Sequence, residues 1–107
     1  FYRKSFEGIL RVDFQQINPL GESNYSYFPI LLESEKKVVE VMGTLKASNI
    51  ITRRYFFPLL SDLDYVSGSP FPKSASIIAQ RILCLPLYFK LTRKEMKLVI
   101  ELIKGLL

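Results

Sequence analysis

The sequence predicts an α+β fold, a small sheet of three to four strands with helices packed on it. Some segments carry apolar residues at helical spacing, whereas others are short aromatic and branched runs typical of strands. The two kinds alternate along the chain, with connections long enough for crossovers. A length of 107 residues suits one domain with one core.

The first residues have the pattern of the end of a helix. Phe1, Tyr2, Phe6 and Ile9 recur at roughly helical spacing, and Gly8 suits a C-cap. Because position 1 is Phe rather than Met, we expect a piece cut from a longer protein. The loss of only a few N-terminal residues would explain the same start.

Two candidate strands follow. Residues 9–17 form the first, which the turn-prone residues 18–21 close. Residues 24–33 form the second and are rich in aromatic and branched side chains. Since Pro29 cannot donate a ladder hydrogen bond, we expect this strand to lie at a sheet edge or to carry a bulge.

Three helices are predicted from spacing and capping residues. Ser34 is the N-cap of a helix to about Ala47, and a shorter helix begins at Ser74. Thr92 and Glu95 form a capping box at the start of the last helix. The buried stripe of that helix consists of Met96, Val99, Ile100 and Ile103.

Two further candidate strands and a long loop complete the pattern. Residues 50–57 form a strand that Pro58 stops, and residues 82–88 form a nearly continuous apolar strand. Residues 61–72 have the Ser, Asp, Gly and Pro content of a surface loop. Ordered loops of that length in small domains are often functional.

Composition excludes several classes of chemistry. The chain has no histidine and one cysteine, Cys84, which excludes a zinc site, a histidine-based triad and an imidazole base. Cys84 lies in an apolar run and is expected to be an inert core thiol in a reducing compartment. No apolar stretch approaches the ~20 residues that span a bilayer. The net charge is +5, but the basic residues are scattered, so we expect neither a membrane nor a nucleic-acid partner.

The densest polar cluster with aromatic neighbours is the segment 52–58. On a strand, Arg53 and Tyr55 point to one face, and Arg54 and Phe56 point to the other. One arginine can then face a cleft while the other pairs with a local carboxylate. A guanidinium group suits phosphate or carboxylate binding through two parallel hydrogen bonds. The structural alternative is a solvated arginine on a strand whose aromatics lie in the core.

Tyr25 and Tyr27 are a second candidate feature. If residues 24–33 are a strand, both tyrosines lie on one face. They could stack on a sugar or a base, or they could be ordinary half-buried aromatics of a sheet.

Three segments together resemble a known family. They are TRRYFFPLL (52–60), the Tyr65 that follows in a Leu-Asp-Tyr context, and ILCLPLYFKLTRKEM (82–96). They resemble the C-terminal part of the DegT/StrS family of pyridoxal-phosphate-dependent aminotransferases that act on nucleotide-linked keto-sugars. NYSYFPILLE (24–33) is similar to the strand that this family places just upstream, and the order agrees across nearly all of residues 20–107.

The resemblance implies that residues 1–107 are the C-terminal small domain of a type I aminotransferase. The parent enzyme would be a cytoplasmic homodimer that transfers an amino group from glutamate to a nucleotide-linked keto-deoxysugar. Its large domain would hold pyridoxal phosphate. This chain would then shape the substrate cleft without being catalytic alone, and we assign it no catalytic, cofactor-binding or metal-binding residue.

The resemblance also implies substrate-binding residues, namely Arg53, Arg54 and Tyr55. Arg54 stands where many relatives have His, and either residue can donate hydrogen bonds to substrate. The chain departs from the family's frequent His after the proline by having Leu59 and Leu60 after Pro58. Two alternatives stay open: a free-standing α+β ligand-binding or interaction domain, and a basic nucleic-acid-binding module.

Overall fold

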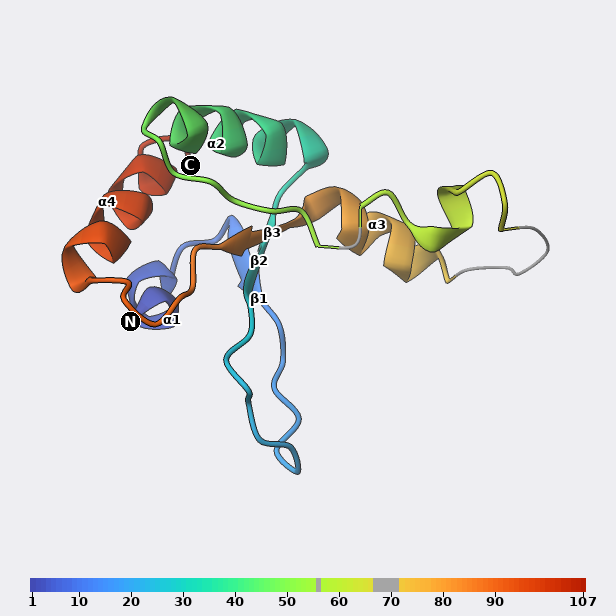
Figure 1. The fold of residues 1–107 in the computed structure, drawn as a ribbon, viewed down its shortest axis with the longest axis horizontal. Coiled ribbons are helices and arrows are strands. Elements are labelled where there is room, and N and C mark those ends of the chain that lie inside the picture. The colour runs from blue at the N-terminus through green and yellow to red at the C-terminus, as the bar shows by residue number, and fades with distance from the viewer. Residues whose placement is uncertain (56, 67–71) are drawn as a thin grey trace.

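The computed structural model describes residues 1–55, 57–66 and 72–107. Its helices and strands, labelled in Figure 1, are α1 (Tyr2–Phe6), β1 (Val12–Phe14), β2 (Phe28–Leu32), α2 (Glu35–Ala47), α3 (Lys73–Arg81), β3 (Ile82–Leu85) and α4 (Arg93–Lys104). A short 3-10 helix, η1 (Leu60–Asp62), precedes α3. Over the described ranges the strands form one antiparallel sheet in the order β1-β2-β3. The predicted α+β fold is confirmed.

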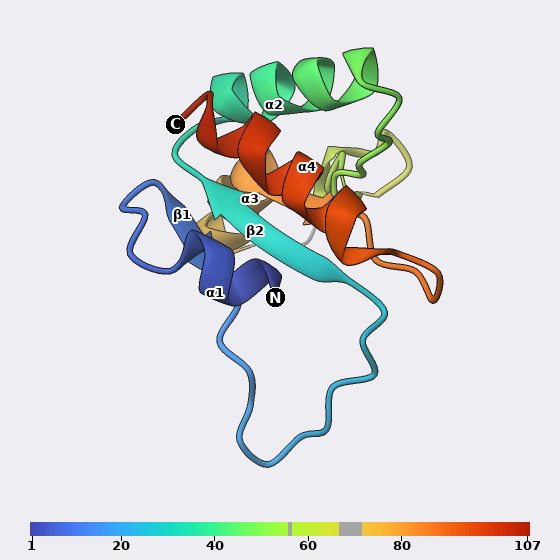
Figure 2. The same cartoon turned by 90° about the vertical axis from the view of Figure 1, so that its left-hand side faces the viewer.

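One face of the sheet forms the core with the helices. Phe14, Ile30 and Leu83 lie opposite one another across the strands, and directly opposed residues share a face. α4 crosses in front of the sheet in Figure 2, whereas α3 lies behind it. The buried side chains of the core come from α1, the sheet, α2 and α4: Tyr2, Phe6, Val12, Ile30, Leu32, Val38, Val41, Leu45, Leu83, Leu85, Val99, Ile100 and Ile103. Burying each large aliphatic side chain contributes about 1.5–3 kcal/mol.

The predicted N-terminal helix is confirmed, and its aromatic residues belong to the core. Tyr2 and Phe6 are buried, and the Tyr2 ring lies 5.1 Å from the Phe28 ring. The Tyr2 hydroxyl donates a hydrogen bond to the Pro86 carbonyl at 3.2 Å. The helix ends at Phe6, and Gly8 follows with φ +80°, a left-handed conformation that glycine adopts without strain.

The predicted starts of α2 and α4 are confirmed by their caps, whereas α3 begins at Lys73, one residue before the predicted Ser74, and has no side-chain cap. The Ser34 hydroxyl accepts a hydrogen bond from the Lys37 backbone N–H at 3.2 Å. In α4 the Thr92 hydroxyl accepts one from the Glu95 N–H, and the Glu95 carboxylate accepts one from the Thr92 N–H at 2.7 Å. These bonds satisfy N–H groups that have no partner within the helices.

The prediction that the strand containing Pro29 lies at a sheet edge or carries a bulge is wrong, because β2 is central and pairs one-to-one with β3 through Pro29. Pro29 lies opposite Cys84. The Cys84 N–H and C=O both bond with Arg53, so Cys84 and Pro29 are not a hydrogen-bonded pair. The Pro29 nitrogen therefore faces β1, and β1 ends at Phe14, opposite Ile30. The central strand tolerates proline because its neighbour stops one residue short.

The strand predicted for residues 50–57 is also wrong, since the described part of this segment contributes only an isolated bridge. Arg53 pairs with Cys84, whose N–H donates to the Arg53 carbonyl at 2.8 Å. Pairing goes no further because the next N–H groups on that side of β3 cannot take part: the Ile82 N–H bonds to the Ile78 carbonyl of α3, and Pro86 has no N–H. Phe56 lies outside the described residues.

The remaining strands are shorter than predicted. The last one ends at Leu85, where Pro86 removes the next N–H. Residues 15–27 are all exposed and belong to no strand, because they have neither a covering layer nor a pairing partner. Tyr25 has φ 54°, so Tyr25 and Tyr27 do not share a strand face as predicted. The loop predicted for residues 61–72 falls partly on residues 67–71, which lie outside the described ranges.

Candidate functional site

A groove of about 890 Å³ lies on the sheet face opposite the core. Its floor consists of Pro29, Leu31 and Ile82, which alternate along β2 and β3 with the core-facing residues. The loop of residues 15–27 forms one wall, and Figure 2 shows this loop extending well beyond the sheet. Ile78 of α3 and Tyr55 complete the lining. The volume is in the range of small-molecule sites.

Two tyrosines from separate segments meet at this groove. Tyr27 precedes β2, and Tyr55 follows the Arg53 bridge. Their ring centroids are 5.2 Å apart and their planes meet at 71°, an edge-to-face contact. Tyr27 is 57% exposed, so much of its ring is open to solvent.

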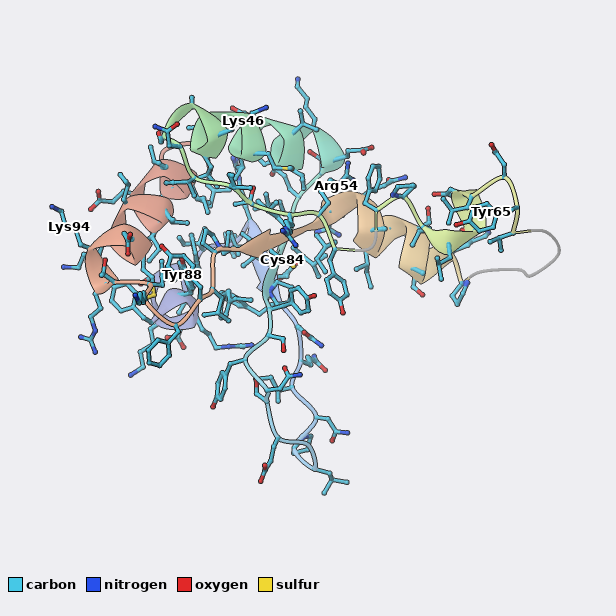
Figure 3. All side chains as sticks on the ribbon, in the orientation of Figure 1. Lys46, Arg54, Tyr65, Cys84, Tyr88 and Lys94 are labelled. Carbon is cyan, nitrogen blue, oxygen red and sulfur yellow. The ribbon has the colours of Figure 1, made fainter. Side chains whose placement is uncertain are left out.

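The two neighbouring arginines point in different directions. Arg54 has a side chain only 13% exposed, and its Nη1 lies 2.8 Å from Oε1 of Glu35. Its Nη2 donates to the Ala79 and Gln80 carbonyls, both at 3.2 Å, and its guanidinium group stacks on the Phe57 ring. Figure 3 shows Arg54 where α3 runs into β3. The prediction that one arginine pairs with a local carboxylate is confirmed.

Arg53 is exposed and lies on the groove side of the sheet. It bridges to Cys84, which lies opposite Pro29 in the floor of the groove. Because directly opposed residues share a face, the Arg53 side chain leaves the sheet on the same side as Pro29. Tyr55 lines the groove, and Arg53 therefore lies on the same face of the sheet without being one of the lining residues. Arg54 anchors the segment to α2 and α3.

The thiol of Cys84 is buried, as predicted, but it lies on the groove face of the sheet and outside the main core cluster. It is 6% exposed, and burial raises the pKa of the thiol. A raised pKa keeps the sulfur protonated at neutral pH and so lowers its nucleophilicity.

Sequence reasoning missed the wall of the groove. The amide and hydroxyl side chains of Asn18, Asn24 and Ser26 line it, although the sequence predicts a turn at Asn18 and a strand at Asn24 and Ser26. Asn18 and Asn24 each accept a hydrogen bond from the N–H two residues further on. These local turns shape the wall, whereas the contact between Tyr27 and Tyr55 has no signal in local sequence.

Comparison with known proteins adds the family. The model of the DegT/DnrJ/EryC1/StrS aminotransferase family matches residues 1–104. The chain belongs to this family. Two curated relatives, from Shigella dysenteriae and Escherichia coli, are each named dTDP-4-amino-4,6-dideoxy-D-glucose transaminase. They are 34% identical over 111 residues and 32% identical over 117 residues.

This chain spans less than a third of the length of these two relatives. Each alignment covers 97% of this chain and 30% of the relative. Among solved structures, the aminotransferase TlmJ from Streptoalloteichus hindustanus has a TM-score of 0.85 at 17% identity, over 98% of this chain and 28% of that one. DesI, solved with its TDP-sugar product, has a TM-score of 0.81 at 24% identity, over 97% and 28%. This chain therefore has the fold of a fragment of a sugar aminotransferase.

The family uses pyridoxal phosphate, and a similar sugar aminotransferase, Spr1654 from Streptococcus pneumoniae, is solved in PLP and PMP forms. The residues of this chain do not fit a site for that cofactor. Its lysines are exposed, apart from half-buried Lys37, which bonds to Glu40 and the Leu106 carbonyl. No lysine is among the described residues that line the groove.

The described residues also lack two other features. They contain no cluster of three His, Cys, Asp or Glu side chains that could hold a metal ion. None of their helices is long and apolar enough to cross a bilayer.

Proposed function

We propose that this chain is the C-terminal small domain of an aminotransferase that acts on a nucleotide-linked keto-deoxysugar. Glutamate would give up its amino group and leave as 2-oxoglutarate, while the keto carbon of the sugar becomes an amine. The proposal rests on the family match and on the names of the relatives, which act on dTDP-linked sugars. The dominant observation in the structure is the groove with Arg53 and Tyr55 beside it.

The share of this chain is to bind the nucleotide sugar. An exposed guanidinium group such as that of Arg53 can bind a diphosphate through parallel charge-assisted hydrogen bonds. Tyr55 lines the groove next to it, and Arg54 fixes the backbone of both through its bonds to α2 and α3. These three residues are the proposed substrate-binding segment.

The rest of the enzyme completes the proposal. A large domain on the same polypeptide would hold pyridoxal phosphate, since the lysines of this chain do not fit that role. A second subunit would pack against it as a homodimer in the cytoplasm. This chain would supply no catalytic group of its own.

Two experiments test the proposal. The coding DNA upstream of Phe1 should continue in frame through a domain with a candidate cofactor-binding lysine. In the full-length enzyme, Arg53→Ala should raise KM for the nucleotide sugar about tenfold or more with little change in kcat, because a diphosphate contact is common to ground and transition states. A start codon directly upstream, or a loss confined to kcat, would contradict the proposal.

A further inference from the structure

We infer that Tyr27 and Tyr55 form the platform on which the base of the nucleotide sugar stacks. This inference rests on the proposed function and goes one step further, because it assigns the planar aromatic part of the substrate to one place in the groove. It also adds Tyr27 to the binding residues.

The geometry of the pair suits a flat ring. The two rings meet edge to face at 5.2 Å, and both line the groove. An edge-to-face contact fixes the orientation of the Tyr27 ring without covering its exposed part, since Tyr27 remains 57% exposed. A ring that is held in place and open to solvent can stack on a base at little entropic cost.

The floor and the wall next to the pair favour a base over a sugar ring. Pro29, Leu31 and Ile82 make the floor apolar, which suits the face of an aromatic ring. A sugar would need hydrogen-bond partners for several hydroxyl groups there. Asn18 and Asn24 lie on the wall, where amide groups can bond to the edge of a base.

Charge sets the direction of the bound nucleotide. Glu22 lines the groove on the loop side, where its carboxylate repels a diphosphate. Arg53 leaves the sheet on the groove face, two residues before Tyr55. The diphosphate therefore lies toward Arg53, and the base lies over the tyrosines on the side of the loop.

The test measures two inhibitors against the nucleotide sugar in the full-length enzyme: thymidine 5′-diphosphate, which has a base, and pyrophosphate, which has none. Tyr27→Leu should weaken inhibition by thymidine diphosphate about tenfold and leave pyrophosphate unchanged. Tyr27→Phe keeps the ring and should behave as the unaltered enzyme. Tyr25→Leu is the matched control, because Tyr25 is in the same loop and is 77% exposed but does not line the groove.

The outcomes separate this inference from the proposed function. If thymidine diphosphate inhibits the Tyr27→Leu enzyme as strongly as the unaltered enzyme, the inference is wrong. It is also wrong if Tyr25→Leu weakens this inhibition as much as Tyr27→Leu does. If Arg53→Ala still weakens both inhibitors in that case, the proposed function stands without the platform. If neither Arg53→Ala nor Tyr27→Leu weakens either inhibitor, the binding role of the whole groove is wrong. Loss of the fold would weaken inhibition by pyrophosphate as well, and this distinguishes an unfolded variant from one that has lost only the stacking platform.

Discussion

Nη1 of Arg54 lies 2.8 Å from Oε1 of Glu35, and this pair ties the first turn of α2 to the segment that carries Arg53 and Tyr55. The same guanidinium group bonds to the carbonyls of Ala79 and Gln80 at the end of α3. Those carbonyls lie in the last turn, where a helix leaves acceptors without internal partners. Arg54 thereby joins two helices and the groove segment through one side chain.

We expect Arg54→Ala to lower the free energy of unfolding by about 1–3 kcal/mol, because it leaves the two helix carbonyls and Glu35 without their donor. Arg54→Lys should lower the free energy of unfolding by a smaller amount, since an ammonium group replaces the charge but not the planar, two-pronged hydrogen bonding of a guanidinium group. Urea denaturation measures both. Glu33→Gln is the control: its ion pair with Arg11 is 3.7 Å long and exposed, so its loss should cost less than about 1 kcal/mol. Equal losses in Arg54→Ala and Glu33→Gln would contradict this account.

Proline should be tolerated at position 29 and not two residues later. The ladder points the Pro29 nitrogen past the end of β1, whereas the Leu31 N–H faces Asp13 in a hydrogen-bonded pair. Pro29→Ala should change stability by less than about 1 kcal/mol, and Leu31→Pro should cost more than about 1 kcal/mol. Thermal denaturation of the two variants tests this prediction. Similar melting temperatures would show that the register of β2 against its neighbouring strands is wrong.

Alkaline pH should weaken the fold through Tyr2. Burial, with smaller effects of Tyr88 and Glu95, raises the pKa of Tyr2 to about 12 from its ordinary value of 10.0. The neutral phenol therefore stabilises the fold fully below pH 10, and this stabilisation is lost as the pH rises through 12. Across that window the free energy of unfolding should fall by on the order of 2 kcal/mol. Urea denaturation of Tyr2→Phe should show a smaller fall, and an unchanged fall would exclude Tyr2 as the cause.

The capping box of α4 should give an acid-sensitive contribution. Thr92→Ala should cost about 1 kcal/mol at neutral pH. The backbone hydrogen bond from Thr92, followed by the one from its side chain, lowers the pKa of Glu95 below its usual value of 4.5. The contribution of Glu95 is therefore present above pH 4.5 and is lost as the pH falls through the lowered pKa.

Thermal midpoints measured against pH test this contribution. Glu95→Gln should unfold at a lower temperature than the unaltered protein at pH 7, and the two should converge in acid. Glu101→Gln, an exposed change on the same helix, should follow the unaltered protein at every pH. A constant difference for Glu95→Gln down to the lowest pH would show that its charge plays no part.

Local chemistry predicts the elements whose causes are local. The caps at Ser34 and Thr92 and the apolar stripe of α4 place the helices correctly. Such features depend on neighbours within a few residues, so periodicity and capping rules suffice for them.

Features that depend on distant partners could not be predicted in the same way. Whether Pro29 lies at an edge depends on where β1 ends, and whether residues 50–57 form a strand depends on the Ile78 carbonyl of α3 and on Pro86. The groove needs a loop, a sheet face and Tyr55 together. Its substrate-binding role remains a prediction until the full-length enzyme is measured.

The wall of the groove and the hydrophobic core are built from separate residues. Residues 15–27 carry no buried side chain, yet they form one wall of the groove and hold Tyr27. Substitutions and length changes there leave the packed residues untouched, so the lining of the groove can change with little loss of stability. The scaffold and the surface that it presents can therefore vary independently.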